Sequence, residues 1–157
     1  MRIVLDGMGS DNYPEPEVLA AVEVAKRFGD EIFLVGQQDR LAPLLEKHNP
    51  DGAPVTLVHA AEVFEMSDKI SGSALRRSEN SMGVGMDLLK EGRADAFVTA
   101  GNTGGAMAIG LAMGLRSTRE MMPLDHTSKA STLGKANDVY QVALLQEAHI
   151  HLVTTLH

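Results

Sequence analysis

The turn Gly101-Asn102-Thr103-Gly104-Gly105 has the residue types of an anion-binding loop. Glycine lets the backbone adopt conformations that other residues avoid, and it lets a ligand approach closely. The first amides of a helix after such a turn have no intrahelical acceptor and lie at the positive end of the helix dipole. Phosphate is the usual occupant of such a site. The alternative is that these glycines only let a helix and a strand pack closely.

Two polar side chains in this turn could take part in binding. Thr103 can cap the following helix or donate its hydroxyl, and the Asn102 amide can bond an oxygen or a carbonyl group. The turn is not a Walker A loop, because no Gly-Lys-Ser/Thr follows it, and it does not match G-x-G-x-x-G. Asn102, Thr103 and Gly104 are therefore the leading candidates for contacts with phosphate or with an oxyanion.

A second glycine loop lies near the start of the chain, between Asp6 and Asp11. Two carboxylates there could orient a water molecule, a cation or a basic side chain. Alternatively, Asp11 caps a turn and Asp6 accepts hydrogen bonds from loop amides. His59 could act as an acid–base group or lie satisfied under a loop. Ser81 is more typical of a helix cap than of a nucleophile.

Cationic candidates are Lys69, Arg76 and Arg77, which could contact phosphate or an acidic partner. The alternative is a solvated helix face. His149 and His151 share one face of an expected strand, but no third metal ligand is apparent, so no metal site is predicted.

Composition narrows the class of protein. A chain of 157 residues suits one domain of ordinary size. The absence of cysteine excludes disulfides, thiolate zinc sites and a cysteine nucleophile, and it fits a cytoplasmic protein. A formal charge of −7 argues against general nucleic-acid binding. The first residues do not resemble a signal peptide, and no apolar run approaches the length of a membrane span.

Hydrophobic patterning predicts the elements that position these residues. Strands are expected at Arg2–Asp6, Glu31–Val35 and Val55–His59, and in the first half of the segment Ala94–Ala106, before its glycine turn. Helices are expected from Pro14 or Pro16 to Phe28, over Arg40–Lys47 with Asp39 as the cap, from Ser81 to Gly92, and over Ala106–Leu115. Alternating strands and helices predict the α/β class, and right-handed crossovers would give a three-layer α/β/α sandwich with a mainly parallel sheet.

Several motifs together resemble those of PlsX-type phosphate acyltransferases, which act in bacterial fatty acid and phospholipid synthesis. The opening Met1-Arg-Ile-Val-Leu-Asp6-Gly-Met-Gly-Ser-Asp11-Asn-Tyr-Pro14 carries the likeness first. It continues through His59-Ala-Ala-Glu62-Val, Asp68-Lys69, Ser81-Met82, Glu91-Gly92-Arg-Ala-Asp95-Ala and Ala100-Gly-Asn-Thr-Gly104. The resemblance covers residues 1–119 and extends at most to Pro123. We therefore divide the chain into a PlsX-like part, 1–123, and an unmatched tail, 124–157, expected to form a helix and a strand.

The resemblance implies a reaction and a set of partners. Inorganic phosphate would attack the thioester of an acyl chain on acyl carrier protein and release acyl phosphate. Asp6, Asn102 and Thr103 would be catalytic. Asp11, Lys69, Arg76, Arg77 and the glycines Gly101, Gly104 and Gly105 would bind substrate. No cofactor or metal is implied, and neither is nucleic acid. A homodimer or other self-association and a peripheral contact with a membrane are further expectations.

Two departures from the family pattern bear on function. The family usually has a longer basic run than Arg76-Arg77, and it has alanine at the position of Gly105. The family chain is also much longer, so we expect an amino-terminal half of a sheet like that of isocitrate or isopropylmalate dehydrogenases or of phosphotransacetylases. Alternatives are a non-catalytic, truncated binding module and a phosphate acetyl- or butyryltransferase that uses coenzyme A. The Asp6–Pro14 motif favours the carrier-protein enzyme over the coenzyme A enzyme.

Overall fold

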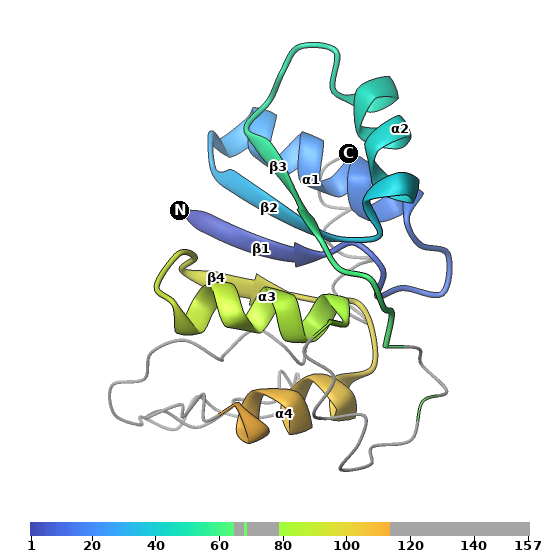
Figure 1. Cartoon of the computed structure of the whole chain (residues 1–157). Helices are drawn as coiled ribbons and strands as arrows, with labels where there is room; N and C mark the ends of the chain where they lie inside the picture. Colours follow the sequence, from blue (N-terminus) through green and yellow to red (C-terminus); the bar gives the residue numbers. More distant parts are fainter. Residues whose placement is uncertain (65–67, 69–78, 114–157) are drawn as a thin grey trace, which may run out of the picture.

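The computed structural model describes residues 1–64, 68 and 79–113 (Figure 1). Its strands are β1 (Arg2–Asp6), β2 (Glu31–Gly36), β3 (Val55–His59) and β4 (Ala96–Val98). Its helices are α1 (Glu15–Phe28), α2 (Gln38–His48), α3 (Ser81–Lys90) and α4 (Thr103–Ala112). The strands form one sheet in the order β3-β2-β1-β4, and every pair is parallel. The predicted α/β class and parallel sheet are confirmed.

Each face of the sheet is covered by helices, which gives the three layers. On one face, α1 and α2 pack on a cluster that includes Ile32 and Leu34. On the other, α3 and α4 pack on a cluster that includes Val4, Val35 and Phe97 (Figure 1). Because neighbouring side chains of a strand point to opposite faces, the apolar strands of a two-sided parallel sheet supply both clusters.

The boundaries of α1 follow local sequence signals. Pro16 lies in the first turn, where its missing N–H costs no helical hydrogen bond. Gly29 ends the helix with a left-handed backbone, φ 71°, and its N–H donates to the Ala25 carbonyl. The predicted helix and its end at Gly29 are confirmed, and it starts at Glu15, between the two prolines that were expected as its start.

The predicted caps Asp39 and Ser81 are wrong, and Thr103 does not have the capping role that was one of its two alternatives. Gln37, not Asp39, is the residue before α2, and Asp39 lies within the first turn. The cap of α3 is Asn80, so Ser81 is the first helical residue. The cap of α4 is Asn102, and Thr103 begins the helix. In α3 and α4 the side-chain carbonyl of the asparagine accepts the amide three residues ahead. The hydroxyl of the serine or threonine that follows it cannot reach that amide in the same way.

Helix α4 also begins earlier than predicted, at Thr103 instead of Ala106. Gly104 and Gly105 are therefore in its first turn and not in the loop before it. Lys69, Arg76, Arg77 and the tail 124–157, with His149 and His151, lie outside the described residues. Among the residues that are described, no helix is long and apolar enough to cross a bilayer.

Candidate functional site

The sheet has a topological switch point at the carboxyl ends of β1 and β4. The chain runs from β1 outward through β2 to β3, and it then returns to the other side of β1 for β4. The loops after β1 and β4 thus leave the sheet side by side and lead to helices on opposite faces. In open α/β sheets, ligands bind in the crevice at this kind of position.

A chain of buried hydrogen bonds joins these two loops. Asp6, at the end of β1, is fully buried, and its Oδ2 accepts a hydrogen bond of 2.8 Å from the Thr99 hydroxyl. The Thr99 Oγ1 in turn accepts from the Gly101 N–H at 3.0 Å. The other Asp6 oxygen, Oδ1, accepts from the Met8 N–H at 3.1 Å. One carboxylate therefore holds the backbone of both loops.

Burial raises the pKa of Asp6 above its ordinary value, because the charged form loses its hydration. The hydrogen bond from Thr99 opposes this shift. The Ser81 hydroxyl also lowers the pKa of Asp6, although its oxygen has no partner in hydrogen-bonding geometry among the described residues.

The two glycine loops touch directly over this chain of hydrogen bonds. A Cβ on Gly9 would lie 2.8 Å from Thr99 Oγ1 and 2.9 Å from the Gly101 nitrogen. A Cβ on Gly101 would lie 3.0 Å from the Gly9 carbonyl oxygen and 2.8 Å from Met82 Cε. Gly9 and Gly101 therefore allow a close contact between two loops, and not the contact of a helix with a strand that was one interpretation of the Gly101–Gly105 turn.

The amino-terminus of α4 offers amides at the same edge. The Asn102 Oδ1 accepts the Gly105 N–H at 2.8 Å, and the Asn102 carbonyl accepts the Ala106 N–H at 2.9 Å. The amides of Thr103 and Gly104 precede these and have no acceptor within the helix. Asn102, Thr103 and Gly104 are partly exposed, so an anion could reach this first turn. Asn102 itself acts as the helix cap.

Gly105 has a packing role of its own. A Cβ there would lie 2.3 Å from Cε1 of Phe64, so the aromatic ring occupies the space of a side chain. Phe64 is buried in the cluster beneath α3 and α4. The segment after β3 thus supports the first turn of α4.

Glu17 is a buried carboxylate that the sequence reasoning missed. It is 2% exposed, and its Oε1 accepts the Ser10 N–H at 3.2 Å. Its Oε2 and the Ser10 hydroxyl are buried without a hydrogen-bond partner among the described residues. Burial raises the pKa of Glu17, and the negative charge of Asp6 raises it further. A glutamate one turn into an amphipathic helix is usually exposed, so its position in α1 carries no signal of burial.

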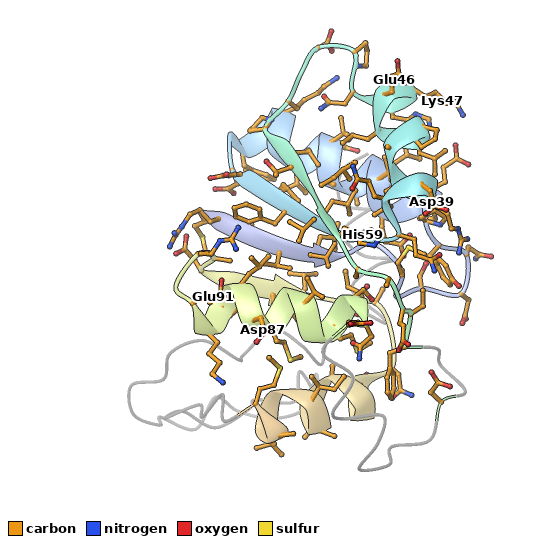
Figure 2. All side chains as sticks on the ribbon, viewed as in Figure 1. Asp39, Glu46, Lys47, His59, Asp87 and Glu91 are labelled. Carbon is orange, nitrogen blue, oxygen red and sulfur yellow. The ribbon has the colours of Figure 1, made fainter. Side chains whose placement is uncertain are left out.

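The remaining candidates lie at the same edge but outside this buried chain. Asp11 is exposed in the turn that the Tyr13 N–H closes onto the Ser10 carbonyl at 3.4 Å. His59 lies at the carboxyl end of β3 and is exposed, which does not fit the interpretation of a histidine satisfied under a loop (Figure 2). Ser81 is buried at the start of α3. No group of three or more histidine, aspartate or glutamate side chains in the described part could hold a metal ion.

Comparisons with known proteins give one consistent result. The family profile described as "Fatty acid synthesis protein" matches residues 1–119. A "Phosphate acyltransferase" of Koribacter versatilis is 47% identical over 109 residues, which is 69% of this chain and 30% of the relative. The protein of that name from Geobacter sulfurreducens is 44% identical over 111 residues, 71% of this chain and 32% of the relative. A third, from Myxococcus xanthus, is 43% identical over 112 residues, which is 71% of this chain and 31% of the relative. The chain thus matches less than a third of the length of these relatives.

Proposed function

The chain belongs to the fatty acid synthesis protein family, and from that premise we propose that it carries the phosphate-binding part of a phosphate acyltransferase. The observation that supports this most directly is the first turn of α4 at the switch point of the sheet. There the amides of Thr103 and Gly104 have no helical acceptor and are partly exposed. The helix dipole favours a negative charge at this position.

In the proposed reaction, an oxygen of hydrogen phosphate attacks the carbonyl carbon of an acyl thioester. A C–O bond forms and the C–S bond breaks, and the sulfur leaves with the electron pair as a thiolate. The thiolate takes up the proton that phosphate gives up, so that acyl phosphate and a free thiol are the products. Because phosphate is the nucleophile, the protein needs no covalent intermediate.

The residues at the site have two tasks in this reaction. The amides of Thr103 and Gly104 hold the phosphate or the oxyanion of the tetrahedral intermediate, and the Thr103 hydroxyl adds a donor. Asn102 holds the first turn of α4 through Gly105. Fixing phosphate against the thioester supplies most of the rate gain, as expected for a reaction between two bound substrates.

We propose acyl carrier protein as the carrier of the acyl chain. Carrier proteins are acidic and this chain has a formal charge of −7, so long-range electrostatics oppose the encounter. The proposed contact is the local cationic segment with Lys69, Arg76 and Arg77, which lies outside the described residues. A cytoplasmic location, a peripheral membrane contact and self-association belong to the same proposal.

The anion site can be tested by removing one amide. In Gly104→Pro, the missing N–H would fall at the second helical residue, where α1 already has Pro16. We expect phosphate binding, measured by calorimetry, to weaken about tenfold or more, as for the loss of one charge-assisted hydrogen bond. The control Gly104→Ala keeps the amide and should bind phosphate better than the proline variant. Equal affinity of wild type and Gly104→Pro would place the phosphate elsewhere.

Activity is tested separately, with palmitoyl-carrier protein, phosphate and hydroxylamine to trap acyl phosphate. Trapped product supports the proposed reaction. Phosphate binding without product would favour the non-catalytic binding module, and turnover only with short acyl-coenzyme A would favour the coenzyme A enzyme.

A further inference from the structure

We propose that Thr99 and Asp6 are positioning residues: they hold in place the first turn of α4, where phosphate would bind, and do not contact the phosphate themselves. This inference rests on the proposed function, because it assigns a task to residues behind that site. Thr99 did not stand out in the sequence, and Asp6 stood out as a catalytic residue. Their contacts in the structure point to a different role.

Each hydrogen bond in this chain has a defined donor and acceptor. A threonine hydroxyl has one hydrogen, and a backbone N–H can only donate, so the Thr99 oxygen must be the acceptor of the Gly101 amide. Thr99 therefore donates to Asp6 Oδ2 at 2.8 Å, which leaves its lone pairs for the Gly101 N–H at 3.0 Å. Reversing the hydroxyl would leave the Gly101 amide facing a hydrogen. The carboxylate thus determines where the amide of Gly101 points.

The hydrogen bonds of this chain are buried, so breaking one of them costs more free energy than it would at the surface. Asp6 is 0% exposed and Thr99 is 2% exposed, so water does not replace a broken bond at low cost. Gly9 packs on the same atoms so closely that even a methyl group would not fit. Burial also keeps the Asp6 carboxylate away from a ligand at the partly exposed turn.

Gly101 connects Thr99 to the proposed phosphate site. It immediately precedes the cap of α4, Asn102, whose side chain and carbonyl accept the amides of Gly105 and Ala106. Displacing the Gly101 amide therefore displaces the turn that presents the Thr103 and Gly104 amides. Since a small misplacement of a binding group weakens binding strongly, we expect Thr99 to influence phosphate affinity at a distance.

Two substitutions of Thr99 separate this role from simple packing. Thr99→Val keeps the shape and removes the hydroxyl, and Thr99→Ser keeps the hydroxyl and removes a methyl group. We expect Thr99→Val to weaken phosphate binding about tenfold, and Thr99→Ser to stay within about twofold of wild type. The Gly101 amide should exchange with deuterium faster in Thr99→Val, because it has lost its acceptor. Val22→Ala in α1, a buried change remote from this chain, is the control for lost stability.

The outcomes distinguish the two proposals. If wild type binds phosphate and Thr99→Val binds it equally well, the positioning role is overturned while the proposed function stands. If Val22→Ala weakens phosphate binding as much as Thr99→Val at equal stability loss, the effect is one of stability and the role is again overturned. A wild type that does not bind phosphate overturns the proposed function and this inference with it. Rescue by Thr99→Ser with a protected Gly101 amide supports the role.

Discussion

The aromatic ring of Phe64 lies against the backbone of Gly105, in the space that a side chain at position 105 would fill. These residues come from the segment after β3 and from the first turn of α4, and both are buried. The resemblance to phosphate acyltransferases implies alanine where this chain has glycine. The contact with Phe64 gives a physical reason for glycine here.

Gly105→Ala should destabilise the protein by about 1–3 kcal/mol, the usual cost of overpacking. Without the ring, alanine would instead stabilise a helix by about 0.5–1 kcal/mol relative to glycine, so the sign is informative. Phe64→Leu in the same chain should make the alanine tolerable. A double-mutant cycle by urea denaturation measures this coupling. If the two substitutions are additive, the ring does not determine the residue at position 105.

Asn80 and Asn102 cap α3 and α4 with the same geometry, each accepting at 2.8 Å the amide three residues ahead. Replacing either with alanine should cost about 1 kcal/mol of stability. Only Asn102→Ala should also weaken phosphate binding, because only α4 begins at the proposed site. Thermal melting and calorimetry on the same samples provide the comparison. Equal loss of phosphate affinity in both variants would point to general destabilisation.

Glu17→Gln should make the stability of the protein less dependent on pH. Because the pKa of Glu17 is raised in the folded state, the folded protein binds a proton more tightly than the unfolded chain. The stability of wild type therefore falls as pH rises from the unfolded pKa, about 4.3, through the folded one. Glutamine removes this penalty and can still accept the Ser10 N–H. Melting temperatures from pH 4 to pH 8 provide the test.

The matched control for that experiment is Glu23→Gln, on the same helix. Glu23 is exposed, so this variant removes one negative charge without changing the environment of Ser10. If both variants change the pH profile equally, net charge and not burial is the cause.

Asp95 should change the pH dependence of stability in the opposite direction from Glu17. Its carboxylate accepts from the Arg2 guanidinium at 2.6 Å and from the Arg2 N–H at 2.7 Å, and these bonds lower its pKa. Its stabilising contribution is thus complete above the unfolded pKa, about 3.9, and is lost as pH falls through the folded one. Asp95→Asn should flatten the acid side of the stability profile. Direct titration of Asp95 by carbon NMR should give a pKa below that of a free aspartate; an unshifted value would contradict the contact.

The strands were predictable because each is a short apolar run that ends at a polar residue or a glycine. Arg2–Asp6 and Val55–His59 agree with the structure at both ends, and the start at Glu31 is also confirmed. The helix caps were less predictable, because serine and threonine are also favoured cap residues. Ser81 and Thr103 were therefore as plausible as caps as Asn80 and Asn102. In the structure the asparagine side chains are the ones that accept the amide three residues ahead, from Gly83 and from Gly105.

The interior of the site was not predictable from local sequence. Thr99 reads only as the end of a strand, and its partner Asp6 is 93 residues away along the chain. Glu17 looks like an ordinary acidic residue in the first turn of a helix, where a negative charge is favourable without burial. Both assignments depend on how β1, β4 and α1 come together, which periodicity does not encode.

The separation of 93 residues between Asp6 and Thr99 also bears on the order of folding. β1, β2 and β3 are neighbours in sequence and can pair while the rest of the chain is still being synthesised, since each closes a loop of moderate length. β4 joins β1 only after the whole stretch between them has been made, and contacts of such high sequence separation form slowly. The nascent protein would therefore hold a three-stranded sheet with the β1 edge open, and the proposed phosphate site after β4 would be assembled only after that sheet.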